Sequence, residues 1–146
     1  MSQRSSSEQS PGTSYAGERL GLPERGPGSV AGWGRRVIAL FVDWFASMLV
    51  AGAIAGPAVM TSREWEAWLP MLVFLVECTV LVALAGGSFG QLLLRVAVVR
   101  LDRRPVSVLM ALLRTLLICL VIPPVVYNRD RRGLHDLAAG TVTVRR

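Results

Sequence analysis

The chain has 146 residues, enough for one domain; 52% of them are hydrophobic and only 18% are charged. The apolar residues gather in three blocks, which excludes an ordinary soluble domain and predicts an all-α membrane protein. The net charge of +6 comes from arginines that flank these blocks, a pattern that membrane insertion explains, so we expect no nucleic-acid partner.

The N-terminal segment, residues 1–32, is rich in Ser, Gly, Pro, Glu and Arg. It offers few side chains to bury, so ordering it would not offset the loss of backbone entropy. We therefore predict a disordered cytoplasmic tail over 1–32 and a membrane domain over 33–146.

Two apolar runs follow, each long enough to cross the roughly 30 Å hydrocarbon core of a bilayer. The first, residues 37–60, contains Asp43, and the second, residues 70–85, contains Glu77 near its centre. Residues 61–69 between them are predicted to form a short loop with Trp65 and Trp68, which suit the membrane–water interface. These runs predict two transmembrane helices.

The third apolar run, residues 106–127, has the length of a crossing but contains Arg114 and the pair Pro123-Pro124. It is predicted to be a membrane-embedded helix that either spans the bilayer or re-enters it. Residues 96–102 are rich in β-branched side chains, and residues 141–145 (TVTVR) alternate with period two. If both lie on the cytoplasmic side, we expect them to pair as a short two-stranded sheet.

The arginines predict the orientation, because positive residues collect in short cytoplasmic loops. Arginines are frequent before residue 37 and within 95–104, whereas the loop at 61–69 contains only Arg63. We therefore expect a multi-pass protein of the cell (inner) membrane with a cytoplasmic N-terminus. The tail at 128–146 is also basic, which favours a third run that returns to the cytoplasm.

Asp43, Glu77 and Arg114 are the ionisable residues of the apolar runs, where a charge usually needs a partner or a wet cavity. They form either an ion or proton site or a set of ion pairs that fasten the helices. Asp43 and Arg114 fall at similar depths in their runs, so we predict that they contact each other. Arg36, Ala39 and Asp43 recur at helical spacing and share one face.

Four stretches in order resemble the RDD family of small membrane proteins, which is named for an arginine and two aspartates. They are RVIALFVD at 36–43, the SFGQLLLRVAVV stretch, ALLRT around Arg114, and RGLHDLAAGTVTV near the end. Together they cover about residues 33–146; Gln91 departs from the pattern, because family members often have a basic residue there. The motif residues are Arg36, Ala39, Gly90, His135, Asp136, Gly140 and Thr141.

The resemblance implies a membrane protein for which transport of ions or small solutes has been proposed. Three short segments cannot easily enclose a pathway, so we expect transport to require a homo-oligomer or a membrane partner protein. The alternative is a non-transporting accessory or scaffold subunit whose charges lock helices together. We expect no enzyme activity, no cofactor and no metal site, because the only histidine, His135, lacks a nucleophile or a metal-ligand set around it.

Overall fold

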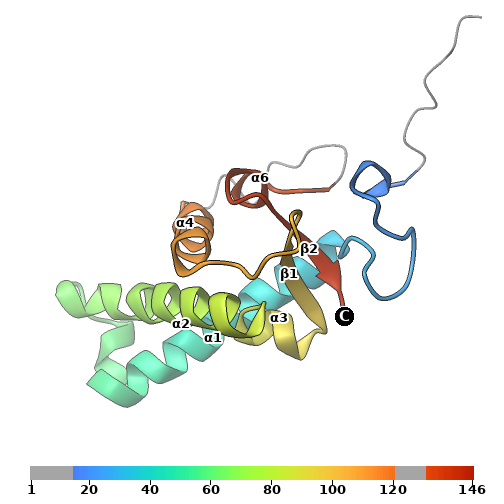
Figure 1. Ribbon diagram of the computed structural model, residues 1–146. Helices are drawn as coiled ribbons and strands as arrows, with labels where there is room; N and C mark the ends of the chain where they lie inside the picture. Colours follow the sequence, from blue (N-terminus) through green and yellow to red (C-terminus); the bar gives the residue numbers. More distant parts are fainter. Residues whose placement is uncertain (1–14, 121–130) are drawn as a thin grey trace, which may run out of the picture.

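The computed structural model describes residues 15–120 and 131–146. Figure 1 shows two long helices, α1 (Trp33–Ala55) and α2 (Leu69–Ala85), joined in a hairpin by 3-10 turns. A shorter helix, α4, lies over α2, and α6 and a small sheet stand at the end opposite the hairpin turn. The short elements are η1 (Glu18–Leu20), η2 (Pro57–Met60), η3 (Trp65–Trp68), α3 (Phe89–Leu93), β1 (Val96–Arg100), α4 (Val108–Cys119), α6 (Leu134–Ala138) and β2 (Thr141–Arg145).

Helix α1 begins and ends earlier than the apolar run at 37–60 suggested. Gly56 has a positive φ of 84°, which favours glycine, and Pro57 follows it, so the α-helix ends before the apolar run does. Its buried residues, Ala39, Asp43, Ser47 and Ala51, recur every fourth position. The predicted shared face is therefore confirmed, and it is lined mainly by small side chains.

Helix α2 continues a 3-10 turn that the sequence predicted as a loop. Residues Trp65–Trp68 form η3, and the apolar stretch Trp65–Ala85 reaches 21 residues. Trp65 and Trp68 remain 72% and 68% exposed, as expected of interfacial side chains. The helical structure begins before Pro70, earlier than the apolar run, because proline suits the first turn of a helix, where its missing N–H is not needed.

Two helices, Trp33–Ala55 and Trp65–Ala85, are long and apolar enough to cross a membrane. Only 22% and 28% of their apolar windows are buried inside the protein, whereas the core helix of a soluble protein would be mostly buried. Exposed apolar surface of this extent calls for a nonaqueous partner, and lipid is the simplest one for helices of this length.

The third predicted segment is a helix of 12 residues, α4, in the part of the chain that the structure describes. At 1.5 Å per residue it measures roughly 18 Å, well short of a crossing. The remainder of the run, including Pro123-Pro124, lies outside the described residues. Whether residues 106–127 cross therefore stays a prediction. Ser107 begins the helix, because its hydroxyl accepts a hydrogen bond from Met110 N–H at 3.3 Å.

The predicted strand pairing is confirmed: β1 and β2 are antiparallel, with Val98 opposite Thr143 and Val99 opposite Val142. The other edge of β2 is occupied by residues that we predicted to be disordered. Ala31 N–H donates to Thr143 O at 2.9 Å, and Arg145 N–H donates to Ser29 O at 2.9 Å. These contacts place residues 29–31 with the sheet, because β2 would otherwise present unpaired backbone groups.

The apolar core is small and divided. One cluster joins α2, β1 and α4 through Val82, Val98 and Ala111, and the other lies between the sheet and the N-terminal segment. The sheet packs on α2 and α4 through the first of these clusters. Buried charged and polar side chains lie where α1, α4, α6 and β2 meet.

Candidate functional site

Asp136 is the centre of a buried charged cluster that joins three elements distant in sequence. Its carboxylate is fully buried on α6. Oδ1 accepts a hydrogen bond from Arg114 Nε of α4 at 2.9 Å, and Oδ2 accepts one from Arg36 Nη1 of α1 at 3.4 Å. The side chains of both arginines are themselves buried, 3% and 9% exposed. The cluster fastens α4 and α6 to the start of the first long helix.

Two strand hydroxyls complete the shell around this carboxylate. Thr141 Oγ1 donates to Oδ1 at 3.1 Å, and Thr143 Oγ1 lies 3.0 Å from Oδ2. Burial alone would raise the pKa of the Asp136 carboxyl, but the charges of Arg114, His135 and Arg36 outweigh burial and hold that pKa well below its usual range. Asp136 therefore stays ionised at neutral pH.

Arg36 and a third arginine, Arg132, also bind backbone carbonyls at the sheet. Arg36 donates from Nη2 to Thr143 O at 3.0 Å and from Nε to Ala31 O at 3.1 Å. Arg132, which the sequence analysis did not single out, donates from Nε to Thr141 O at 2.9 Å. Arg132 is only 8% exposed. An arginine three residues before His135 was the available signal, but its role depends on where β2 lies.

The predicted contact between Asp43 and Arg114 is wrong. Arg114 binds Asp136 and Thr143, and the two oxygens of Asp43 bind α3 and the residue before it. Matching depths in two apolar runs predicted the contact, but α6 lies outside these runs. Because α6 folds back against α4, the Asp136 carboxylate lies closer to the Arg114 guanidinium than Asp43 does.

Asp43 forms a second buried cluster, in which carboxylates cap the start of α3. Gly90 N–H donates to Asp43 Oδ1 at 2.5 Å, and Ser88 Oγ donates to Asp43 Oδ2 at 2.5 Å. Phe89 N–H donates to Glu77 Oε1 at 2.9 Å. The first amides of a helix have no partner within it and favour negative charge, so both carboxylates are well placed there.

The glycine at position 90 and the glutamine at position 91 each have a structural reason. A Cβ at Gly90 would lie 2.2 Å from the carbonyl oxygen of Ala39, so only glycine lets α3 approach α1 so closely. The Gln91 carboxamide accepts from Ser88 N–H at 3.1 Å and completes a capping box. Gln91, the departure from the family pattern, thus has a local structural role.

One group of three potential metal ligands occurs among the described residues. One ligand atom each from Asp43, Glu77 and Cys78 lies within 4.8 Å of the others. The carboxylates already accept N–H and O–H donors from the turn before and within α3, and Cys78 Sγ lies 3.1 Å from Glu77 Oε2. The geometry therefore serves the helix cap first, and we assign no metal to it.

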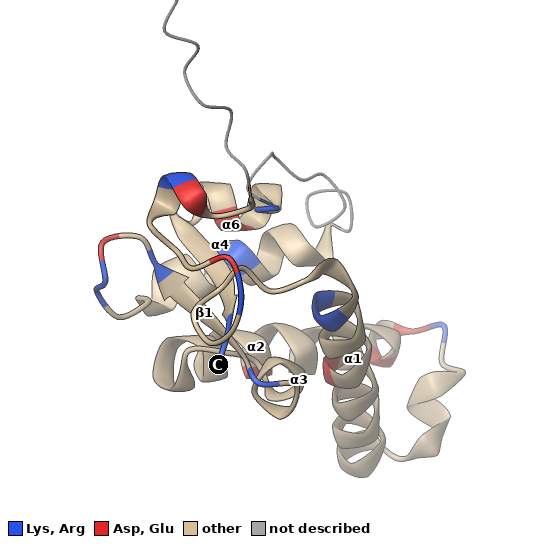
Figure 2. Cartoon of the chain, turned by 90° about the vertical axis from the view of Figure 1, so that its right-hand side faces the viewer, with Lys and Arg blue, Asp and Glu red and all other residues tan. Residues whose placement is uncertain are grey.

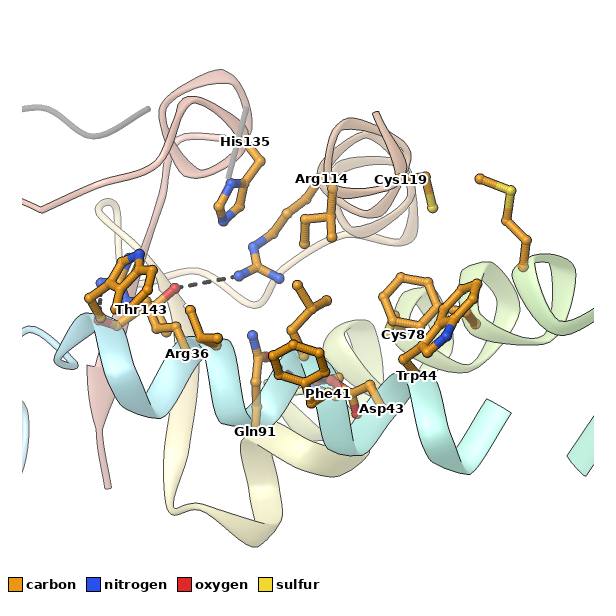
Figure 3. A pocket seen from close by; sticks show the side chains of 17 residues that line it. Arg36, Phe41, Asp43, Trp44, Cys78, Gln91, Arg114, Cys119, His135 and Thr143 are labelled. Atoms are coloured by element: carbon orange, nitrogen blue, oxygen red, sulfur yellow. Dashed lines mark hydrogen bonds between the residues drawn. The ribbon is translucent and has the colours of Figure 1, made fainter. Parts of the chain in front are cut away.

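A cavity of about 430 Å³ separates the two clusters. Figure 3 shows its walls: Arg36, Arg114, His135 and Thr143 lie toward one end, and Trp44, Cys78 and Cys119 toward the other. His135 is 4% exposed, and its Nε2 lies 3.7 Å from Asp136 Oδ1. Apolar lining comes from α1, α2 and α4, through Val37, Leu40, Phe41, Met71, Phe74 and Ile118.

The family model that matches this chain is described as the RDD family, and the match covers residues 30–140. The chain belongs to the RDD family. The RDD match includes Arg36, Asp43 and Asp136, which the structure divides between two clusters: Arg36 pairs with Asp136, and Asp43 caps α3. Nothing matches the chain among curated proteins or among solved structures.

The remaining RDD motif residues have structural positions that fit their types. Gly140 links α6 to β2 with φ 62°, a left-handed conformation that favours glycine. Thr141 follows it and binds the Asp136 carboxylate. Sequence reasoning therefore found most members of both clusters, but it missed Arg132, Thr143 and Ser88 and did not predict how the members pair.

Proposed function

We propose that this RDD protein is a non-transporting accessory or scaffold subunit of a membrane assembly. The observation that carries the proposal is the internal use of its buried charges. Asp43 and Arg114 are each 3% exposed, Asp136 is fully buried, and all three bind partners within the chain. Charges committed in this way fasten helices and sheet together, whereas a transported ion needs a carboxylate that can exchange its partners.

The subunit is proposed to lie in the cell (inner) membrane with its sheet on the cytoplasmic side. Figure 2 shows blue residues gathered around the sheet and the C-terminus, while the long helices are mainly uncharged. Arg63 lies at the other end, in the hairpin connection. In a protein with Cys78 and Cys119 replaced by alanine, a cysteine at Ser62 should react with an impermeant thiol reagent on intact cells. A cysteine at Ser5 should not, and its labelling would reverse the orientation.

Purification of the full chain in mild detergent, with a mass measurement and identification of co-purifying proteins, tests the accessory role. We expect a stable complex with a second membrane protein. The Asp136→Asn variant should lose that complex together with its own stability, whereas Asp102→Asn, in an exposed loop, should keep both. A chain that purifies alone and moves ions by itself would refute the proposal.

Transport through an oligomer is the second candidate, and one observation favours it: Asp43 lines the cavity and lies close to Glu77. Vesicles reconstituted with the purified chain and loaded with a cation-sensitive dye would test it. Flux that Asp43→Asn abolishes and Asp102→Asn leaves unchanged would establish transport over the accessory role. Equal dye signals from protein-containing and empty vesicles would dismiss it.

A further inference from the structure

The lining of the cavity between the two clusters changes from cationic to apolar along the axis of α1. One end carries the Arg36 and Arg114 guanidinium groups, and beyond it the wall is formed by Phe41, Trp44 and Phe74. Arg36 and Trp44 lie eight positions apart on α1, which corresponds to roughly 12 Å along its axis. A ligand that fits both ends must be anionic at one end and apolar over the rest.

The cationic end has donors available for such a ligand. An arginine side chain carries five N–H donors in a planar fork. Among the described residues, Arg114 uses Nε for Asp136 and one Nη2 donor for Thr143. Its guanidinium is buried, lies on the cavity wall and keeps further donors for an acceptor placed there. The titratable and charged groups of the lining include two arginines, His135 beside Asp136, and one carboxylate, Asp43, which is bound to Ser88 and Gly90.

The cavity also opens where lipid would be. Trp33 and Phe41, both 59% exposed, are among its lining residues, and they belong to a helix long enough to cross the bilayer. A soluble anion would not need this apolar wall, and a second apolar helix would not satisfy the arginine end. Charge complementarity and the apolar wall together select a bilayer amphiphile.

We propose that the cavity is a binding site for one anionic phospholipid from the surrounding bilayer. The phosphate accepts charge-assisted hydrogen bonds from Arg114 at the edge of the Asp136 cluster. One acyl chain lies along Phe41, Trp44 and Phe74, and the rest of the lipid stays in the bilayer. A volume of about 430 Å³ lies within the range of small-molecule sites and suits part of a lipid rather than all of it.

Native mass spectrometry of the full chain in nonionic detergent tests the site. The probes are palmitoyl-oleoyl phosphatidylglycerol, the phosphatidylcholine with the same chains, and glycerol phosphate as the headgroup alone. We expect one phosphatidylglycerol per chain, retained at about tenfold lower concentration than phosphatidylcholine. Both lipids carry the phosphate, but the choline ammonium of phosphatidylcholine cancels the negative headgroup charge that the arginine end of the cavity favours. Glycerol phosphate should not compete. Equal retention of the two lipids, or full competition by glycerol phosphate, would overturn the proposal.

Matched variants locate the bound lipid. Val37→Trp places an indole in the cavity and should lower phosphatidylglycerol retention about tenfold, whereas Val50→Trp, on the same helix and outside the lining, should not. Phe41→Ala and Phe45→Ala provide a second pair that requires no added volume; these phenylalanines are similarly exposed, but only Phe41 lines the cavity. If Val37→Trp fails to fold, the comparison of Phe41→Ala with Phe45→Ala tests the site in its place. If the folded lining variant retains phosphatidylglycerol as well as its control does, the assignment of the cavity as the lipid site is refuted.

Discussion

Replacing Asp136 by asparagine should destabilise the protein more than most single changes can. The substitution keeps the size of the side chain but removes the negative charge that binds both Arg36 and Arg114. The Arg114 side chain is 3% exposed, so solvent cannot replace the carboxylate. Removing one partner of a buried ion pair costs about 3–5 kcal/mol in the free energy of unfolding, and we expect a value in that range.

A double-mutant cycle shows whether this loss comes from the ion pair itself. Asp136→Asn and Arg114→Gln should each be severe, and together they should cost about 0.5–3 kcal/mol less than the sum of the two. Asp43→Asn combined with Arg114→Gln should be closer to additive, because these side chains bind different partners. Additivity in the first pair, measured by thermal unfolding in detergent, would refute the role assigned to Asp136.

The pH dependence of stability gives an independent check. Asp136 has a folded-state pKa below its usual 3.8, so its contribution is fully present above that value and is lost as pH falls through the folded pKa. Below about pH 5, the difference in unfolding free energy between wild type and Asp136→Asn should therefore narrow as the pH falls. A difference that widens on acidification would contradict the sign of the shift.

Two further predictions concern packing and register. Gly90→Ala should lower the free energy of unfolding by at least about 1–3 kcal/mol, because its methyl group would meet the backbone of α1. Gly34→Ala, which has open space around it, should instead stabilise α1 slightly, and thermal unfolding of the two variants tests both expectations. Cysteines at Val99 and Val142 should crosslink in membranes, while the pair Val98 and Val142 should not, because neighbouring residues on a strand point to opposite faces. Crosslinking of the second pair alone would mean that the register is shifted by one residue.

The sequence by itself determined the features that depend on local composition. Long apolar runs predict two membrane-spanning helices, because no backbone donor or acceptor can remain unpaired in lipid. The period-two pattern of residues 141–145 and the β-branched residues before Asp102 predicted the sheet that the structure contains. The ordered motifs identified the RDD family, which the family match confirms. Each helix and strand is indicated within one short stretch of chain, and the family is indicated by the order of several such stretches.

Only the tertiary structure decided which charges meet. The pairs Arg36–Asp136 and Gly90–Asp43 join residues 100 and 47 positions apart, and their partners depend on how α3, α6 and β2 fold back onto the helices. The same folding brings Ser29 and Ala31 beside β2, although their segment has the composition of a disordered tail. Composition and periodicity describe the face of one element. A buried charge binds the complementary group that lies nearest once the elements have packed, and that distance is a property of the whole fold.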